Sequence, residues 1–176
     1  QLQDCVALLS GALLPLGLSP FDFWPLVLLA PAALFWSTCD TGRSRTMWRF
    51  YLFNVGMFAV GISWIFVSIN VYGGASTLLA GFLVALFVLA FSLICLPQAW
   101  IYATWLRPNR FAAASAFVGL WVLQEWFRGW FLTGFPWLFL GYGVMETPLV
   151  NLAPVLGVFG VSLAACACSV YAALAL

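Results

Sequence analysis

Residues 78–96, LLAGFLVALFVLAFSLICL, form an apolar run without a single charged side chain. Crossing the hydrocarbon core of a bilayer takes about 20 residues of α-helix. A membrane-spanning β-strand would instead alternate apolar and polar residues over a segment of roughly ten. Because this run is unbroken and of helical length, it predicts a membrane-spanning α-helix and an all-α fold.

The composition of the whole chain supports this prediction. Of its 176 residues, 65% are hydrophobic and only 6% are charged. A soluble domain carries about 25% charged residues, so this chain has too few polar side chains to cover a water-facing surface. The sequence therefore predicts a polytopic integral membrane protein built as a helical bundle.

Apolar segments that resemble the run at 78–96 recur along the chain, and we expect about six transmembrane segments. They cover approximately residues 5–18, 23–38, 50–70, 76–106, 111–128 and 151–176. The first two are short and contain prolines, so they predict a short helical hairpin. The fourth is long, which predicts a tilted helix with a kink at Pro97. In the sixth, Gly160, Ala164, Cys168 and Ala172 recur every four residues and predict a close helix contact.

The arginines are distributed unevenly between the two predicted faces of the membrane. Five of the six lie in the loops after segments two and four, at Arg43, Arg45, Arg49, Arg107 and Arg110. Cytoplasmic loops carry an excess of basic residues, so both loops are expected in the cytoplasm. Both chain ends then also lie on the cytoplasmic side. The opposite, non-cytoplasmic face holds the loops at 19–25 and 70–76 and the long stretch 125–150.

Missing residue types exclude several kinds of chemistry. The chain has no histidine and no lysine, so it has no histidine general base, no histidine-ligated metal and no lysine nucleophile. Its five cysteines lie in or at the ends of apolar runs, where cysteine usually behaves as a small hydrophobe. Cys166 and Cys168 lack the spacing and partner ligands of a metal site. We therefore expect neither a metal nor a cofactor.

The stretch EWFRGWFLTGFPW, residues 125–137, places two charges in an apolar environment. On a continuous helix Glu125 and Arg128 lie one turn apart on the same face. An unpaired charge near hydrocarbon costs about 2.5 kcal/mol or more. Two interpretations stay open: the residues form a structural ion pair, or they belong to a lipid-binding cleft formed with the long loop that follows.

Four motifs resemble one known family in their order and spacing. They are SPFDFWP (19–25), WIFVSINVYGG (64–74), EWFRGWFLTGFPWLFLGY (125–142) and NLAPVLGVFGVS (151–162). Together they make the chain similar to the membrane portion of the bacterial apolipoprotein N-acyltransferases. The resemblance covers nearly the whole chain and is strongest from Glu125 to Tyr142.

This resemblance implies a function. Members of the family have eight transmembrane helices and a periplasmic carbon–nitrogen hydrolase (nitrilase-like) domain inserted before the last helix. They move an acyl chain from a phospholipid, usually phosphatidylethanolamine, to the α-amino group of the diacylglyceryl-cysteine that begins a lipoprotein. The acyl chain passes through a thioester on a catalytic cysteine, which a glutamate and a lysine assist. The implied location is the bacterial inner membrane, with the active face in the periplasm.

The chain departs from the family pattern in one respect. No hydrolase domain is found in residues 1–176, and without lysine the family's Glu-Lys-Cys triad cannot be assembled. Neither Glu125 nor Glu146 matches the catalytic glutamate motif, and no cysteine lies in the context of the nucleophile. We therefore expect a portion that corresponds to helices one to six of eight, with no catalytic residue, which is inactive alone.

The resemblance also suggests substrate-binding residues. Trp137, in FPW, matches a tryptophan implicated at the entrance to the family's site, and Tyr142, Arg128 and Glu125 lie in the same motif. The implied partners are a phospholipid acyl donor, a diacylglyceryl lipoprotein acceptor and membrane lipids, with no nucleic acid and a monomeric state. Aromatic rings can cover acyl chains, and an arginine at headgroup depth can meet a phosphate.

A non-enzymatic membrane protein, such as a transporter half or an assembly subunit, is the alternative. A transporter is expected to carry polar groups in the middle of its helices, along a transport path. Here the polar residues cluster at one face, which favours a site at the membrane surface.

Overall fold

Residues 1–175 are described by a computed structural model, and they contain helices and loops but no strand. The α-helices are α1 (Leu2–Leu13), α2 (Pro25–Thr38), α3 (Arg43–Gly61), α4 (Trp64–Val67), α5 (Thr77–Phe91), α6 (Leu96–Trp105), α7 (Arg110–Arg128) and α8 (Ala153–Ala175). Short helical turns join them: η1 (Leu14–Gly17), η2 (Ser68–Tyr72), η3 (Ser92–Cys95), η4 (Phe131–Thr133), η5 (Leu140–Val144) and η6 (Pro148–Leu152). The predicted all-α class is confirmed.

The prediction of about six transmembrane segments is not confirmed. Among the described residues, Thr77–Trp105 and Pro148–Ala175 are long and apolar enough to cross a bilayer. The pair Arg43–Gly61 and Trp64–Tyr72, bent by 49°, adds a third if it counts as one span. The two helices of the first hairpin are apolar but short, as predicted. The fifth predicted segment is α7, which carries three charged residues, Arg110, Glu125 and Arg128.

The helix breaks have local causes. In place of the kink expected at Pro97 there is a 3₁₀ turn one turn earlier, η3 before α6, and Thr77–Trp105 counts as one span. Proline has no N–H to donate to the carbonyl four residues before it, so the helix tightens in this turn. The predicted segment 50–70 begins instead at Arg43 and breaks at Ile62, between α3 and α4.

Two glycines bring α1 and α3 together. A Cβ atom added to Gly11 would collide with the Phe53 carbonyl, and one added to Gly56 would collide with the Leu8 carbonyl. Each glycine therefore faces the backbone of the other helix, which is the close approach that small residues permit in membranes. The stripe predicted on α8 is not used in this way, because Cys168 and Ala172 are exposed. The buried face of α8 is the neighbouring one, with Val161, Ala165 and Cys166.

Aromatic rings from four helices form the centre of the core. Phe35 of α2, Phe50 of α3, Tyr102 of α6 and Phe117 of α7 are each at most 2% exposed. Their ring centroids lie 5.6–5.9 Å apart in mostly edge-on or tilted pairs, the arrangement that aromatic quadrupoles favour. These contacts join helices that are distant in the sequence.

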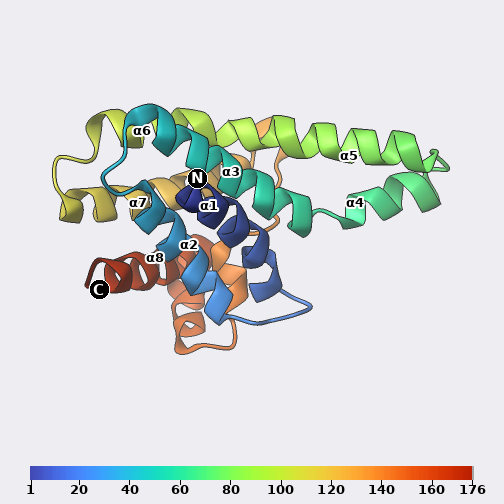
Figure 1. Cartoon of the computed structure of the whole chain (residues 1–176). Coiled ribbons are helices and arrows are strands. Elements are labelled where there is room, and N and C mark those ends of the chain that lie inside the picture. The colour runs from blue at the N-terminus through green and yellow to red at the C-terminus, as the bar shows by residue number, and fades with distance from the viewer. Residues whose placement is uncertain (176) are drawn as a thin grey trace.

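The two arginine-rich loops meet at one end of the molecule (Figure 1). Arg107 donates to the carbonyls of Thr38 and Thr41 at 3.0 and 2.9 Å, at the end of α2. Arg110 pairs with Asp40 at 3.1 Å. The C-terminal part of α8 reaches the same end, where the Ser115 and Tyr171 hydroxyls lie 2.8 Å apart. This places the five arginines of the two loops together, as their expected location on one side requires.

The N-terminus is attached to the same end by Asp4. Its carboxylate accepts from Arg49 Nε and from Arg45, both at 2.9 Å. Asp4 precedes the apolar part of α1, and its hydrogen bond to Arg49 lowers the pKa of the carboxyl below its ordinary value. The guanidinium of Arg49 also donates to the Ser37 carbonyl of α2, so three helices meet at this side chain.

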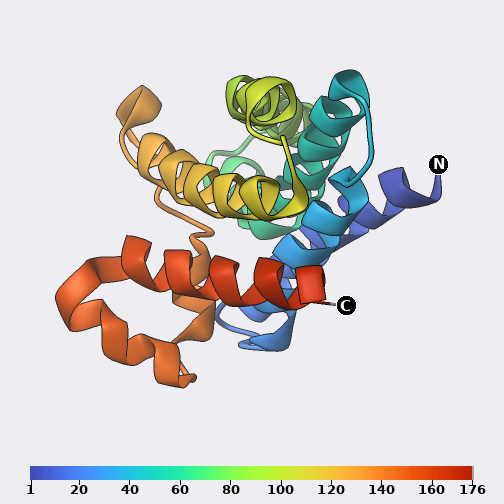
Figure 2. The same ribbon diagram turned by 90° about the vertical axis from the view of Figure 1, so that its left-hand side faces the viewer.

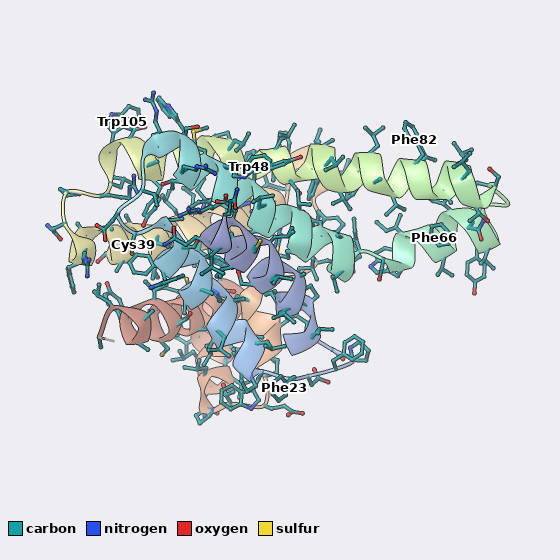
Figure 3. All side chains as sticks on the ribbon, viewed as in Figure 1. Phe23, Cys39, Trp48, Phe66, Phe82 and Trp105 are labelled. Carbon is teal, nitrogen blue, oxygen red and sulfur yellow. The ribbon has the colours of Figure 1, made fainter. Side chains whose placement is uncertain are left out.

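At the opposite end, α4 and the N-terminal half of α5 extend beyond the other helices (Figure 1). We call residues 64–82 the arm. Phe66 and Phe82 mark it in Figure 3, where they lie far from Cys39 and Trp105 at the arginine end. Tyr72, Leu78 and Phe82 are 86%, 85% and 61% exposed, so the arm presents apolar side chains outward. Asn70 closes its tip by donating to the Ala75 carbonyl at 2.8 Å.

Candidate functional site

The candidate site residues lie on and beneath the loop that follows α7. The backbone turns sharply there, because Leu132, Thr133, Gly134 and Leu138 have φ angles of 50°, 76°, 90° and 62°. A positive φ is rare for a residue other than glycine and especially so for a β-branched one. The loop folds back onto the helix, where Phe135 N–H donates to the Arg128 carbonyl at 2.7 Å.

Glu125 holds this loop from beneath. Its Oε1 atom accepts from the backbone N–H of Leu140 at 2.7 Å and from the Trp121 ring N–H at 3.0 Å. The side chain is buried, with 4% exposed. A buried carboxylate is stable only with such hydrogen bonds, so Glu125 fixes the position of the loop and does not meet solvent or lipid.

Arg128 holds the same loop from the next turn of α7. Its guanidinium donates to the Leu138 carbonyl at 3.1 Å and lies 5.6 and 5.2 Å from the ring centroids of Phe58 and Phe139. The residue is only 3% exposed. Aromatic faces attract a desolvated cation, which offsets part of the cost of burying it. The positive φ of Leu138 belongs to the backbone that presents this carbonyl.

A direct ion pair between Glu125 and Arg128 is not present. The ion pairs within 4.0 Å among the described residues involve Asp4 and Asp40 instead. Both residues of the predicted pair bind backbone atoms of the loop, ten to fifteen positions later in the sequence. The interpretation as a simple ion pair is therefore wrong, and the expected headgroup contact of Arg128 is opposed by its burial.

Trp137 is the exposed aromatic of this loop. Half of its surface is accessible, and its ring lies 5.1 Å from Phe135 and 6.1 Å from Trp64. Phe135 packs in turn against Phe91 of α5 at 5.2 Å. Trp137 thus stands at the base of the arm, between the loop and α4, and it remains free to contact a ligand.

Trp64 was not among the residues predicted for the site. It begins α4, is 46% exposed, and forms one wall of the same aromatic surface as Trp137. The motif WIFVSINVYGG contains it, but tryptophans near a membrane surface usually form an interfacial belt. The contact of its ring with Trp137 joins α4 to a loop far along the chain, which the motif alone does not reveal.

Tyr142 lies on η5, farther along the loop. It is 48% exposed and stacks on Phe139 at 5.8 Å with an angle of 12° between the rings. The Arg128 guanidinium also lies over the Phe139 ring. Tyr142 therefore packs beside the Arg128 contact and not against Trp137. Gly141 N–H donates to Ser162 Oγ at 2.8 Å and anchors η5 to α8. Figure 2 shows α8 turning back near its start, where Gly157 has a φ of 62°.

Two open hollows of the surface differ in character. One of about 510 Å³ lies beside the loop and is almost wholly apolar; it is lined by residues that include Phe87, Phe91, Pro97, Phe127 and Phe131. The other, of about 630 Å³, lies at the arginine end with Asp40, Arg107 and Arg110. It is distant from Trp137 in the fold, so its size does not make it the site. Among the described residues no cluster of three His, Cys, Asp or Glu side chains is placed to hold a metal.

The fold and the site define an all-helical domain of a membrane protein. Two buried charged side chains position its aromatic loop, residues 129–139 between α7 and η5. The chain belongs to the family described as the apolipoprotein N-acyltransferase N-terminal domain, whose model matches residues 10–171. The description of this family names an enzyme, and not a transporter or an assembly subunit.

Named relatives agree with this assignment. The chain is 48% identical over 163 residues to the apolipoprotein N-acyltransferase of Pseudomonas syringae pv. tomato. The corresponding enzymes of Azotobacter vinelandii and Coxiella burnetii are 46% and 38% identical over 163 and 164 residues. These alignments cover 92% of the chain but 32%, 32% and 34% of the relatives. The chain therefore spans about a third of the length of these relatives.

Proposed function

We propose that this chain is the membrane part of an enzyme that transfers an acyl chain from a phospholipid to the N-terminal diacylglyceryl-cysteine of lipoproteins. Its role is to form the cleft by which lipid reaches the reacting groups at the periplasmic face of the inner membrane. The observation that carries this proposal is Trp137, which is half-exposed on a loop held by two buried charged side chains. An exposed ring on a fixed backbone is suited to bind an acyl chain at low entropic cost.

The apolar hollow beside the loop supports the same role. It opens next to η4 and is lined by phenylalanines of α5 and α7. Such a surface accepts hydrocarbon without leaving a polar group unpaired. Tyr142 and Trp137 are both half-exposed, and we assign both to the contact with substrates. Glu125 and Arg128, which are buried, position the loop.

We assign the covalent chemistry to the parts of the full-length enzyme beyond this chain. The chain has no lysine, so a triad of glutamate, lysine and cysteine cannot be built from it. The isolated chain is expected to show no acyl transfer from phosphatidylethanolamine to a diacylglyceryl lipopeptide. Transfer by the isolated chain would contradict this assignment.

The substitution Trp137→Ala in the full-length enzyme tests the proposed cleft. We expect acyl transfer to a diacylglyceryl lipopeptide to fall by about tenfold or more, which corresponds to about 1.4 kcal/mol of transition-state stabilisation. The thermal midpoint should change little, because half of the ring is already exposed.

Trp126→Ala is the matched control for this test. Trp126 is exposed to a similar extent, 48%, but it lies on α7 and packs against Trp130. Its loss should leave the transfer rate unchanged. Wild-type turnover by the Trp137 variant would show that the proposed contact with substrate is wrong.

A further inference from the structure

The two buried charged side chains that hold the loop after α7 each have one polar atom without a hydrogen-bond partner. They are Oε2 of Glu125 and Nε of Arg128, and neither has a hydrogen bond within the part of the chain that the structure describes. Both residues are more than nine-tenths buried. A buried polar atom left unpaired is strongly unfavourable, and more so when it is charged. The two residues lie one helical turn apart on α7, so one small partner between them could satisfy both atoms.

The same two residues line one small, partly open pocket. Its volume is about 20 Å³, and its walls include Asn54 and Gln124 as well as apolar side chains such as Met57. A volume of about 10–15 Å³ is enough for one water molecule. A buried water also needs two to four polar partners, which Glu125, Arg128 and the two amide side chains can supply.

We propose that one ordered water molecule occupies this pocket and bridges Arg128 Nε to Glu125 Oε2. The water accepts a hydrogen bond from the Arg128 N–H and donates a hydrogen bond to Glu125 Oε2. Its second proton is directed to an amide oxygen of Asn54 or Gln124. The amide nitrogen of Asn54 already donates to the Phe50 carbonyl at 3.0 Å, which leaves its oxygen free to accept.

This water accounts for the separation of the two charges. The water-mediated bridge leaves Glu125 Oε1 free for the Leu140 N–H and a terminal guanidinium nitrogen free for the Leu138 carbonyl. A direct pair would draw the side chains together and away from one or both of these loop contacts. The bridging water therefore lets one pair of residues satisfy its own charges and position the loop at the same time.

The direct test is a structure of the full-length enzyme in a lipid nanodisc, at a resolution that shows buried waters. We expect one density peak at about 2.7–3.2 Å from both Glu125 Oε2 and Arg128 Nε. An empty pocket with the two atoms still apart would overturn the proposal. A direct contact between the two side chains would also overturn it.

Two variants at one position test the energetics in the full-length enzyme. Glu125→Gln keeps an oxygen for Leu140 N–H and an amide that can bond the water, whereas Glu125→Ala removes both. We expect the alanine variant to lower the thermal midpoint by about 5 °C or more and the glutamine variant by less than half as much. Equal losses would show that the charge itself, and not the hydrogen-bonded bridge, holds the loop.

The idea that the bridge positions Trp137 for acyl transfer rests on the proposed function. The presence of the water does not depend on that function. If the water is present and Trp137→Ala has no effect on transfer, the proposed function fails alone. If Trp137→Ala impairs transfer and the pocket is empty, the present inference fails alone. Rescue of transfer by Glu125→Gln, relative to Glu125→Ala, would support the positioning role.

Discussion

At the scale of single residues, charge and exposure are divided between different side chains. The charged members of the predicted site, Glu125 and Arg128, are buried and bind loop backbone. The aromatic members, Trp137 and Tyr142, are half-exposed. In hydrocarbon this division is favourable, because rings tolerate contact with lipid while charges require fixed partners. In the proposed function, the residues that position the loop and the residues assigned to contact substrate are therefore distinct.

Trp64 should act together with Trp137. Its ring lies 6.1 Å from that of Trp137 on the same exposed surface, so both rings are available to one acyl chain. We expect Trp64→Ala to lower acyl transfer by the full-length enzyme by roughly the same factor as Trp137→Ala, about tenfold. The double variant should lose less than the product of the single losses, because residues in contact are coupled. Strictly multiplicative effects would show that the rings act separately.

At the scale of elements, close helix contacts depend on where glycine faces a backbone. Gly11 and Gly56 do so between α1 and α3, whereas a Cβ atom added to Gly119 on α7 would meet nothing within 4 Å. Spacing alone favoured a stripe on α8 whose members Cys168 and Ala172 are exposed. A repeat of small residues shows that a close approach is sterically allowed, and the positions of the other helices determine whether it occurs.

A substitution at Gly56 should separate the first and third helices. In Gly56→Ala the added methyl group meets the backbone of Leu8 and Ala12, which cannot rotate away as a side chain can. We expect a loss of about 1–3 kcal/mol in unfolding free energy, measured by thermal unfolding in detergent. Gly119→Ala is the control, and it should be neutral or stabilising by roughly 0.5–1 kcal/mol. A Gly56 variant as stable as the control would contradict the observed helix contact.

At the scale of the whole molecule, the two ends have different bonding. The arginine end is held by charged hydrogen bonds that join α1, α2, α3 and the loop before α7. The other end carries the exposed arm (Figure 1), and the loop with Trp137 lies at the base of the arm. The proposed substrates meet the second end. The hydrogen bonds of the arginine end are therefore assigned to stability.

The attachment of the N-terminus should weaken in acid. Arg49 lowers the pKa of Asp4 in the folded chain, so this group adds stability above its unfolded pKa, about 3.9. That stability is lost as the pH falls through the lower, folded pKa. Thermal midpoints measured from about pH 5 down to pH 3 should therefore drop more for the wild type than for Asp4→Asn. An identical pH dependence in both proteins would show that the Asp4–Arg49 contact does not contribute.

Part of this architecture was predictable from local patterns and part was not. The approximate positions of the helices, the short first hairpin and the grouping of the arginines follow from apolar runs and loop composition. The expected number of spans is not confirmed, because apolar segments such as α2 are shorter than a bilayer crossing requires and α7 carries three charges. The burial of Glu125 was not predictable, since its partner is the backbone of Leu140, and every residue type except proline offers the same N–H.

The sequence by itself determined an all-helical membrane protein and the family to which the chain belongs. In hydrocarbon each backbone group must be paired within its own segment, so an apolar run of sufficient length specifies a helix without reference to the rest of the chain. Only the tertiary structure decided that Glu125 and Arg128 turn inward beneath the loop and that Trp64 meets Trp137. Those contacts join residues ten or more positions apart in the sequence, and their geometry is set by how the helices and the loop pack, which no local pattern encodes.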